Sequence, residues 1–499
     1  MTVNLGERIR KALATPLHND YTLDPTRELA AILQEVGLGI ESTGGTISFS
    51  GKDPILKSPL PLATMAATGL MAKAVAVADI WRFRTGQGQD LAVNLGQVLH
   101  RLCPFYDKKW ELLNGYPAGV PSDPTNPFMP SFMYKTRDDR WIQLLNIYPR
   151  AKTAALAFLG CNDDSRAIGE VVRKWNAFEL EEAANRAGLQ ANVVRSVEEF
   201  LNCEQYPYIE NGPLIEIEKI GETDPMPFDR NPVTPLSGIR ALGLGHVIAG
   251  SGLGRALAYH GADVLNVWRP LDFETDVVYY TANVGMRSSI LEIGHPDGMA
   301  RFQELLKGAD VFFSNRRPGY LSKLDLTADA VAAKRPGIIH VDLSLYGPSG
   351  PWANRTGFDQ NAGGVTGIFT LEGTLENPRL TEIFVINDYL MSWLAAVGSL
   401  VALKRRATEG GSYRVRISLV RLSMWLLQLG IFDKTYANAI GGSEGEHAFL
   451  APTLFTAKTP CGYYQGVTDQ VEMSRTPGSY SFPLVPRGSS EAKWLERGT

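Results

Sequence analysis

The sequence predicts an α/β protein in which a Rossmann-like parallel sheet is joined to a smaller α+β domain. From Pro235 onward, short apolar runs alternate with helical periods, a pattern typical of right-handed β–α–β units. The stretch before it contains a hairpin pattern and several short helices instead. With 499 residues, 44% of them hydrophobic, the chain can hold two or three domains, each with its own core.

We expect four parts along the chain. They are an incomplete first unit with a glycine-rich segment, a buried helix and a strand (1–105), a small α+β domain (106–230), a Rossmann-like domain (231–440), and C-terminal strands with a tail (441–499). The tail contains LVPRGS, which matches a common protease-cleavage linker. The residues after it form no obvious tag, so we expect it to be native sequence.

The first unit contains an expected helix at 25–37 and a glycine-rich strand or turn at 42–54. Its long helix, 62–84, has almost no polar face, which predicts burial on all sides. A TGQGQ turn and a short strand, DLAVNL, follow this helix. The small domain should then contain a hairpin at 131–147, helices at 152–160, 167–175 and 178–187, and a short strand at 191–194.

The Rossmann-like part should begin with the strand SGIRALGLG and a helix that is entered through glycines. Further strands are expected at ADVLNVW, ADVFFSN and PGIIHVDLSLYG, with another helix at 295–308. A strand-like run, EIFVIN, then leads to Asp388 and a long apolar helix that ends in a tight turn and a strand. The stretch from Leu62 to Leu95 is a weaker echo of this arrangement.

The composition and the residue spacing argue against several classes of function and site. The net charge of −4 and the pI near 6.1 show no basic excess, so we expect no nucleic-acid partner. The four cysteines lie far apart and no histidine pair has metal-ligand spacing, so neither a zinc site nor a disulfide framework is indicated. The N-terminus lacks a signal-peptide core, and no apolar run reaches the roughly 18 residues of a membrane span. We expect a cytoplasmic protein without a membrane partner.

Glycines 250, 252 and 254 follow a strand and open a helix, which indicates either backbone approach to a phosphate or close packing of the helix on the sheet. The next strand ends in Trp268 and Arg269, whereas an NAD site would need an acid there.

Arg316, Arg317 and Lys323 surround a Pro-Gly turn after another strand. That turn is either a phosphate site at the carboxyl edge of the sheet or a solvated basic loop.

Asp388 allows two interpretations. Asp is a preferred N-cap residue, so its role can be to begin the helix. The alternative is a carboxylate nucleophile that attacks an acyl thioester and forms a mixed anhydride. Glycines at 363, 364 and 367 could then offer backbone donors to the developing oxyanion.

Several motifs together resemble the class III CoA-transferase family, also called the carnitine dehydratase and bile-acid-inducible protein F family. The stretch from Pro235 to Pro270 resembles the family opening, SNRRPGYLSKLDL resembles its NFRPGxxxxLGL motif, and LYGPSGPWANRTGFDQ resembles its GxGPxxxxxGYD segment. The family nucleophile is an aspartate that starts the helix before the TGxGQ turn, and here that position is Asp388. The resemblance implies a CoA site made by Arg269, Arg287, Asn315, Arg316, Arg317, Lys323 and Phe358.

The chain departs from the family pattern in ways that matter. Phe358, thirty residues before Asp388, stands where the family has a tyrosine or histidine. In the family's racemases this residue is a histidine that acts as one of two bases, and a phenylalanine cannot move a proton. His246 replaces the usual arginine, and GMRS replaces GKRS, so Met286 stands for a CoA-binding lysine beside Arg287. The small domain precedes the nucleotide-binding half, which suggests two incomplete family units or a permuted one. In the first copy Thr64 falls near the place of the acid, so one nucleophile per chain is expected.

The resemblance therefore implies an acyl-CoA:carboxylate CoA-transferase that works through an aspartyl-CoA thioester. Coenzyme A and acyl-CoA would be substrates, small carboxylates the other substrates, and no cofactor would stay bound. A homodimer is implied as well. Two alternatives remain: an acyl-CoA racemase or isomerase that pairs Asp388 with another base, and a non-catalytic CoA-binding protein.

Overall fold

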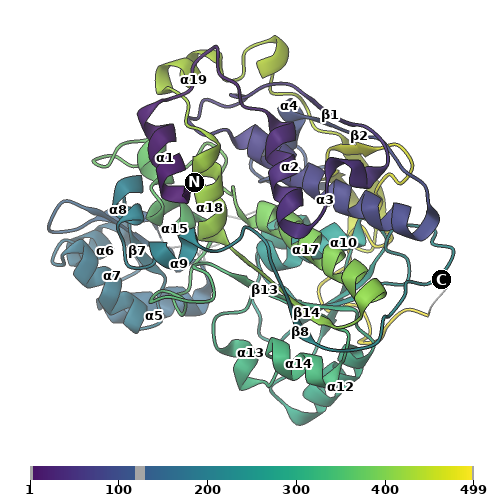
Figure 1. The fold of residues 1–499 in the computed structure, drawn as a ribbon. Coiled ribbons are helices and arrows are strands. Elements are labelled where there is room, and N and C mark those ends of the chain that lie inside the picture. The colour runs from purple at the N-terminus through teal and green to yellow at the C-terminus, as the bar shows by residue number, and fades with distance from the viewer. Residues whose placement is uncertain (1–3, 119–129, 497–499) are drawn as a thin grey trace.

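The computed structural model describes residues 4–118 and 130–496. Its largest element is a seven-stranded sheet in the order β11-β10-β9-β12-β13-β14-β8 (Figure 1). The strands are β8 (Glu216–Gly221), β9 (Arg240–Leu244), β10 (Asp263–Trp268), β11 (Arg287–Ile290), β12 (Val311–Ser314), β13 (Ile339–Ser344) and β14 (Ser412–Ser418). The strands from β9 to β14 run parallel, with β9 near the middle and the chain winding outward first to one side and then to the other. The predicted doubly wound α/β fold is confirmed.

One part of the sheet differs from the prediction. β8, which we had placed in the small domain, pairs antiparallel with β14 and closes one edge, so the sheet is mixed. Arginines on β14 form ion pairs with acids on β8, namely Arg414 with Glu218 and Arg416 with Glu216. Such cross-strand pairs favour this register.

Helices cover both faces of this sheet. The helices of this part of the chain are α10 (Ala249–Ala258), α11 (Asp276–Ala282), α12 (Pro296–Lys307), α13 (Tyr320–Lys323), α14 (Ala328–Lys334), α15 (Asp359–Val365), α16 (Ile368–Glu372), α17 (Asp388–Glu409), α18 (Leu419–Leu429) and α19 (Lys434–Ile440), and some of them pack on the sheet. Successive strand residues alternate between two cores, since Leu242 packs with Phe302 of α12 whereas Ala241 packs with Leu253 of α10. α12 and α14 therefore cover one face, and α10 and α17 the other (Figure 1).

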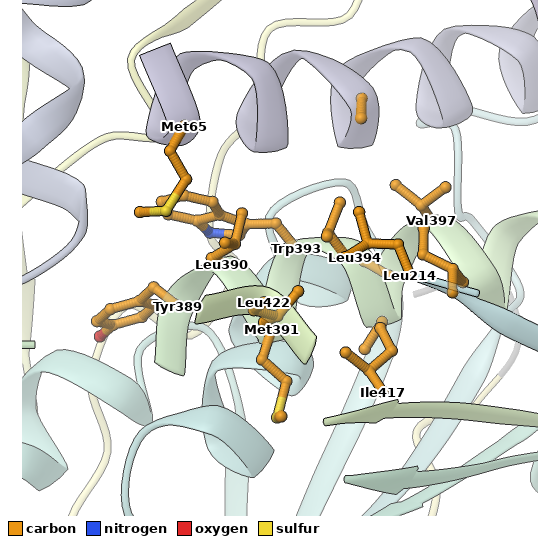
Figure 2. Packing of buried hydrophobic residues seen from close by; sticks show 14 of the residues in the cluster. Met65, Leu214, Tyr389, Leu390, Met391, Trp393, Leu394, Val397, Ile417 and Leu422 are labelled. Atoms are coloured by element: carbon orange, nitrogen blue, oxygen red, sulfur yellow. The ribbon is translucent and has the colours of Figure 1, made fainter. Parts of the chain in front are cut away.

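The first part of the chain packs against α17. It comprises α1 (Leu5–Ala14), α2 (Pro25–Val36), β1 (Ile47–Ser50), α3 (Leu62–Thr85), β2 (Leu91–Asn94) and α4 (Leu95–Val98). α3 packs directly on α17, and Figure 2 shows Leu390, Trp393 and Leu394 between the two helices. By length and composition α3 could cross a membrane, which corrects the statement that no run is apolar enough, yet its apolar window is entirely buried in the protein. The predicted burial on all sides is confirmed up to Ile80.

Two small sheets join segments that are distant in sequence. β1 and β2 are parallel, and β17 (Val471–Met473) from the tail pairs antiparallel with β2. β15 (Leu454–Thr459) and β16 (Gly462–Val467) form a hairpin that continues through β3 (Leu112–Leu113) to β4 (Tyr116–Pro117). Within the LVPRGS segment Leu484 and Val485 are buried, so this segment is part of the packed structure.

The small domain is a three-stranded sheet covered by short helices. Its strands are β5 (Met133–Lys135), β6 (Trp141–Leu144) and β7 (Ala191–Val193), and the helices that pack on them are α5 (Pro149–Leu159), α6 (Ser165–Val172) and α7 (Ala177–Arg186). The next two helices, α8 (Val197–Leu201) and α9 (Tyr206–Glu210), pack into the main core. The predicted hairpin, three helices and short strand are all confirmed. Arg195 anchors this domain to the main one, because its backbone N–H donates to the carbonyl of Gly364 at 3.0 Å.

Two of the glycines that open α10 serve close packing. A Cβ added to Gly252 would lie 2.4 Å from Ser392 Oγ on α17, and one added to Gly254 would lie 3.0 Å from Phe313 Cζ and 3.2 Å from Val264 Cγ1. These contacts favour the packing interpretation for both positions. A Cβ added to Gly250 would instead lie 2.3 Å from Oδ1 of Asn315.

Gly254→Ala is expected to destabilise the protein by about 1–3 kcal/mol, because the new methyl group meets the sheet and the Met286 sulfur. Gly169→Ala in α6 is the matched control, since its nearest neighbour would be 3.8 Å away. This control should be neutral or stabilise by up to about 1 kcal/mol. Urea unfolding measures both. Equal midpoints for the two variants would contradict the tight contact between α10 and the sheet.

Candidate active site

The candidate site lies where the order of the parallel sheet reverses. β9 and β12 are neighbours, and they end at Leu244 and Ser314, which are register partners. The helices that follow these two strands cover opposite faces, so a crevice opens beyond the carboxyl ends of the strands, where ligands bind in such folds. Three predicted residues, Arg269, Asn315 and Arg316, lie at this edge because each directly follows or nearly follows a strand end.

Two asparagines, Asn315 and Asn266, hold the backbone that leaves β9. Asn315 donates to the carbonyl of His246 at 2.7 Å and accepts from its N–H at 2.9 Å. Asn266 makes the same pair of bonds with Gly245, at 3.0 and 2.9 Å. Val247 then adopts a left-handed conformation with φ of 58°, which is unusual for a β-branched residue. Strained backbone of this kind is typical of functional sites.

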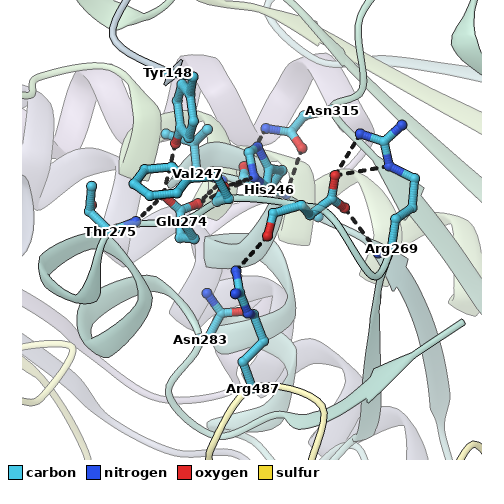
Figure 3. A network of polar contacts seen from close by, with 12 residues as sticks. Tyr148, His246, Val247, Arg269, Glu274, Thr275, Asn283, Asn315 and Arg487 are labelled. Atoms are coloured by element: carbon cyan, nitrogen blue, oxygen red, sulfur yellow. Dashed lines mark hydrogen bonds and ion pairs between the residues drawn. The ribbon is translucent and has the colours of Figure 1, made fainter. Parts of the chain in front are cut away.

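Glu274 holds the strained residue in place. Its carboxylate accepts from the Val247 N–H at 2.9 Å and from the Tyr148 hydroxyl at 2.8 Å (Figure 3). Tyr148 belongs to the small domain, so the two domains meet here. Burial raises the pKa of the Tyr148 hydroxyl well above its usual value, and the carboxylates of Glu274 and Asp388 raise it further. Asp388 therefore lies close to this network.

Aromatic rings line the same region. The Tyr148 ring stacks on Phe358 with a centroid distance of 5.8 Å and an interplanar angle of 19°. His246 packs 5.3 Å from Tyr148, and its Nε2 lies 2.9 Å from the carbonyl oxygen of Phe273. Burial lowers the pKa of His246, so the imidazole is neutral near pH 7. Phe358 thus contributes packing, while Tyr148 and His246 bring polar groups to the crevice.

Arg269 and Arg316 converge on one acid. Asp272 accepts from Arg269 at 2.5 Å and from Arg316 at 2.7 Å. Burial of Asp272 acts to raise its pKa, but the hydrogen bonds from the two guanidinium groups outweigh it and hold the pKa well below its usual range. Both guanidinium groups also lie over the ring of Tyr320, at 5.2 and 5.8 Å. The triad carries a net positive charge at the carboxyl edge.

The structure brings some predicted CoA-site residues together and leaves one apart. Arg317 and Lys323 are exposed on the turn that follows Arg316, near the same edge. Arg287 instead starts β11 at the opposite, amino edge of the sheet, where it is buried and forms an ion pair with Asp263 at 2.7 Å. Its guanidinium also donates to the backbone carbonyl of Lys493 at 2.7 Å. These partners give Arg287 a structural role at a distance from the crevice.

Asp388 is the first residue of α17, not its N-cap. Asn387 occupies the cap position, and no side chain caps the helix, so the N-cap interpretation was wrong. Asp388 is only 7% exposed. Within residues 4–118 and 130–496 its carboxylate accepts no hydrogen bond. Because neither of its oxygens is among the fully enclosed, unpaired side-chain atoms of the described residues, the carboxyl group keeps some contact with solvent although most of the residue is buried.

A second acid, Asp359, positions the turn before α17. Its carboxylate accepts from the N–H groups of Ile386 at 2.7 Å and Asn387 at 3.0 Å. Gln360 donates to the carbonyl of Phe384 at 2.9 Å. Because these side chains engage its backbone, the predicted strand at EIFVIN does not form. Asp359 lies in one of the motifs that resemble the family, but no role was predicted for it from the sequence.

Burial sets the protonation of the two acids. Burial raises the pKa of Asp359 to about 6, although the backbone hydrogen bonds that its carboxylate accepts act to lower this pKa. It raises the pKa of Asp388 well above its usual value, and the nearby Asp359 charge adds to the effect. Two interacting carboxyl groups lose their protons in steps that belong to the pair. The pair therefore holds one proton more readily than two isolated carboxylates would.

The pair makes stability depend on pH. The folded protein keeps protons that the unfolded chain releases above about pH 4, so the free energy of unfolding falls as pH rises through 6. Asp388→Asn removes this penalty and should stabilise the protein increasingly between pH 5 and 8, by about 1.4 kcal/mol per pKa unit. Urea unfolding across that range measures it, with the exposed Asp329→Asn as control. A stability gain that is the same at every pH would contradict the raised pKa.

The upstream repeat around α3 has a counterpart of Asp359 but none of Asp388. Asp53 accepts from the N–H of Thr64 at 2.6 Å at the start of α3, much as Asp359 does before α17. Both Thr64 and Asp388 lie 22 residues before the glycine that ends their helix, Gly86 and Gly410. A threonine hydroxyl replaces the reactive carboxyl, so α3 packs against α17 without offering a second nucleophile.

Comparison with known proteins now identifies the segment that carries this site. Residues 236–467 match the model of a family described as CoA-transferase family III. This segment belongs to CoA-transferase family III. It contains Asn315, Arg316, Asp359 and Asp388, and the resemblance seen in the motifs is confirmed.

The curated relatives are longer than the matched region. The acetyl-coenzyme A transferase nodX of Hypoxylon pulicicidum is 29% identical over 329 residues, 60% of this chain and 55% of the relative. The succinyl-CoA–L-malate CoA-transferase alpha subunit of Chloroflexus aurantiacus is 28% identical over 250 residues, 46% of this chain and 57% of the relative. The chain thus spans a little over half the length of these relatives. A crystal structure of a CAIB/BAIF family protein from Brucella suis aligns with a TM-score of 0.35 and 23% identity, over 46% of this chain and 65% of that one.

Proposed function

We propose that this family III chain transfers CoA from an acyl-CoA to a small carboxylate, with Asp388 as the nucleophile. The Asp388 carboxylate attacks the thioester carbonyl of the donor, the C–S bond breaks, and a mixed anhydride and a CoA thiolate result. The thiolate then attacks the aspartyl carbonyl and displaces the acyl group as a free carboxylate, which leaves an aspartyl-CoA thioester. The acceptor carboxylate attacks this thioester, and the returning thiolate attacks the new anhydride at the acceptor carbonyl. Asp388 is regenerated.

The state of the Asp388 carboxyl group supports the proposal most. It is 7% exposed at the start of α17, accepts no hydrogen bond from the described residues, and lies near Tyr148 at the switch point of the sheet. The N-terminal end of a helix favours the carboxylate form over the neutral acid. Because burial raises the pKa of Asp388 and the nucleophile is its carboxylate form, transfer should become faster as the pH rises.

The positively charged side chains at the carboxyl edge of the sheet support CoA as the group that is transferred. Arg269 is partly exposed, with 39% of its side chain accessible, and Arg317 and Lys323 are exposed on the adjoining turn. We place the CoA phosphates against these three side chains, with Arg316 held behind them by Asp272. Phe358 and Asn315 would border the path from the phosphates to Asp388. Arg287 is left out of this set because of its place at the amino edge.

A small carboxylate is the proposed acceptor. The relatives are named for succinyl-CoA with L-malate and, in a human protein 30% identical over 186 residues, for succinyl-CoA with glutarate. Those names describe carboxylates on both sides of the transfer. We propose the same class here, in a cytoplasmic homodimer. Light scattering of the purified chain tests the dimer.

Proton transfer at the α-carbon is the second candidate. Phe358 cannot act as a base, but Tyr148, His246 and Glu274 bring proton-carrying groups to the same crevice. A racemase or isomerase would exchange the α-hydrogen of an acyl-CoA with deuterium from the solvent and would need no second carboxylate. Retention of the α-hydrogen during transfer would exclude this alternative.

Mass spectrometry of products formed from a mixed pool of acyl-CoAs and carboxylates tests the proposal. We expect new acyl-CoAs that carry the acceptor acids, with total CoA conserved. Heat-inactivated protein is the control. Tight CoA binding without any new acyl-CoA from a broad pool would favour a non-catalytic CoA-binding protein instead.

A further inference from the structure

The last part of the tail lies along β11, the strand at one edge of the main sheet. The N–H of Ser490 donates to the carbonyl of Ser288 at 2.7 Å. Gly488 lies beside Ile290, the last residue of β11, because a Cβ added to this glycine would be 2.4 Å from Ile290 Cδ1. Residue numbers in the tail therefore fall as those in β11 rise. The tail brings Arg487 to the carboxyl edge of the sheet, where the crevice opens.

Arg487 reaches from the tail to the loop that joins β10 to α11 (Figure 3). Its Nη1 donates to the backbone carbonyl of Asp272 at 2.8 Å, and its guanidinium lies over the ring of the buried Trp268, 5.4 Å from the centroid. The carboxylate of the same Asp272 pairs with Arg269 and Arg316. The residue that holds the two arginines of the crevice is therefore itself held from the tail.

Other side chains of the site depend on the same loop. Glu274, near its end, accepts from the Tyr148 hydroxyl at 2.8 Å, and the carbonyl oxygen of Phe273 lies 2.9 Å from Nε2 of His246. The loop has little apolar packing of its own, since Leu271 is 78% exposed and Phe273 is 40% exposed. Segments with few buried contacts open at low cost, so the position of this loop depends on its polar contacts. Arg487 supplies one of them from outside the loop.

We propose that Arg487 is a positioning residue for the CoA site. It fixes the backbone of Asp272 and, through the Asp272 carboxylate, the direction of the Arg269 guanidinium. This inference rests on the proposed function, because it takes the CoA phosphates as the ligand of Arg269. Charge-assisted hydrogen bonds to phosphate depend on the placement of the guanidinium group, so releasing the loop should weaken the binding of CoA. The Asp388 carboxyl group should keep its reactivity.

Steady-state kinetics separate this role from a purely structural one. Arg487→Ala should raise KM for the donor acyl-CoA roughly 10-fold, about the value of one hydrogen bond to a charged group, and leave kcat within about 3-fold. Arg487→Lys should recover part of this loss, because an ammonium group can still donate to the Asp272 carbonyl. A lower kcat at an unchanged KM would contradict the proposed role.

Arg475→Ala is the matched control for Arg487→Ala. Arg475 is also an exposed arginine of the tail, and its Nε donates to a backbone carbonyl, that of Gly88, at 2.8 Å. Because Gly88 belongs to the turn after α3, this contact does not involve the loop between β10 and α11. Arg475→Ala should leave KM for the acyl-CoA unchanged, and a rise equal to that of Arg487→Ala would overturn the inference.

Calorimetric titration with free CoA tests the same step without the transfer reaction. Arg487→Ala should bind CoA roughly 10-fold more weakly than the wild-type chain. In the Arg269→Ala background the same substitution should cost less than about 3-fold, since the group through which Arg487 acts is already gone. Equal affinities of the wild-type chain and Arg487→Ala, or the same loss in both backgrounds, would overturn the inference and leave the proposed function in place. A wild-type chain that binds no CoA would overturn the proposed function and this inference with it.

Discussion

Asp388→Asn is expected to lower the rate of CoA transfer by roughly four to six orders of magnitude, the range seen when a catalytic nucleophile is removed. The substitution keeps the shape of the side chain but replaces the attacking carboxylate with an amide, which forms no anhydride. The fold should survive, because the Asp388 carboxylate accepts no hydrogen bond from the described residues and its burial is unfavourable when charged. The rate of acyl-CoA formation, followed by chromatography, measures the effect.

Two controls separate chemistry from structure. Asp359→Asn keeps a side-chain oxygen for the turn before α17 but removes the neighbouring charge, so the pKa of Asp388 should fall and the pH profile of transfer should shift to lower pH, while burial, the larger cause, still keeps this pKa raised. The exposed Asp329→Asn should leave the rate unchanged. Near-normal transfer by Asp388→Asn would exclude this residue as the nucleophile.

Asp469→Ala is expected to destabilise the fold by about 3–5 kcal/mol, because it leaves two buried cations without their partner. Asp469 is 3% exposed and pairs with Lys73 of α3 and, at 3.3 Å, with Arg101. Arg101 lies over the ring of Tyr389, 4.5 Å from its centroid, next to Asp388. The C-terminal tail, the first unit of the chain and α17 therefore meet at this cluster. The free energy of unfolding in urea measures the loss.

A surface pair provides the matched control for Asp469→Ala. Glu304 of α12 pairs with Lys307 at 2.6 Å, but its side chain is 58% exposed, so Glu304→Ala should cost no more than about 1 kcal/mol. Adding Lys73→Met to Asp469→Ala should recover part of the loss, since one unpaired charge is then removed. Equal losses for the two single variants would show that the buried cluster does not support the fold as described.

Local patterns in the sequence predicted most of the main sheet. β9, β10, β12 and β13 and the helices α10 and α12 all lie where period and length placed them, because each is defined by its own apolar spacing. β8 was missed since its only reason to join the sheet is a pairing with β14, whose Arg416 lies 200 residues beyond Glu216. The run EIFVIN is apolar enough for a strand, but its backbone is hydrogen-bonded to the side chains of Asp359 and Gln360 and does not form one.

The candidate site was predictable only in part. Motifs pointed to Asn315, Arg316 and Asp388, which follow or begin regular elements. Tyr148 and Glu274 carried no such signal, since one lies between a strand and a helix of the small domain and the other in a loop. The protonation of Asp388 depends on burial and on Asp359, neither of which sequence spacing reveals. Arg287 was assigned by motif alone, whereas the register of β11 with β10 places it at the amino edge.

Chemical trapping of the enzyme intermediate tests the central claim most directly. The protein is incubated with donor acyl-CoAs in the absence of acceptor, treated with hydroxylamine, digested, and the peptide that contains Asp388 is examined by mass spectrometry. We predict a hydroxamate on the Asp388 side chain that requires the donor and is absent from Asp388→Asn. Active transfer with an unmodified Asp388, or with the hydroxamate on another residue, would contradict the account.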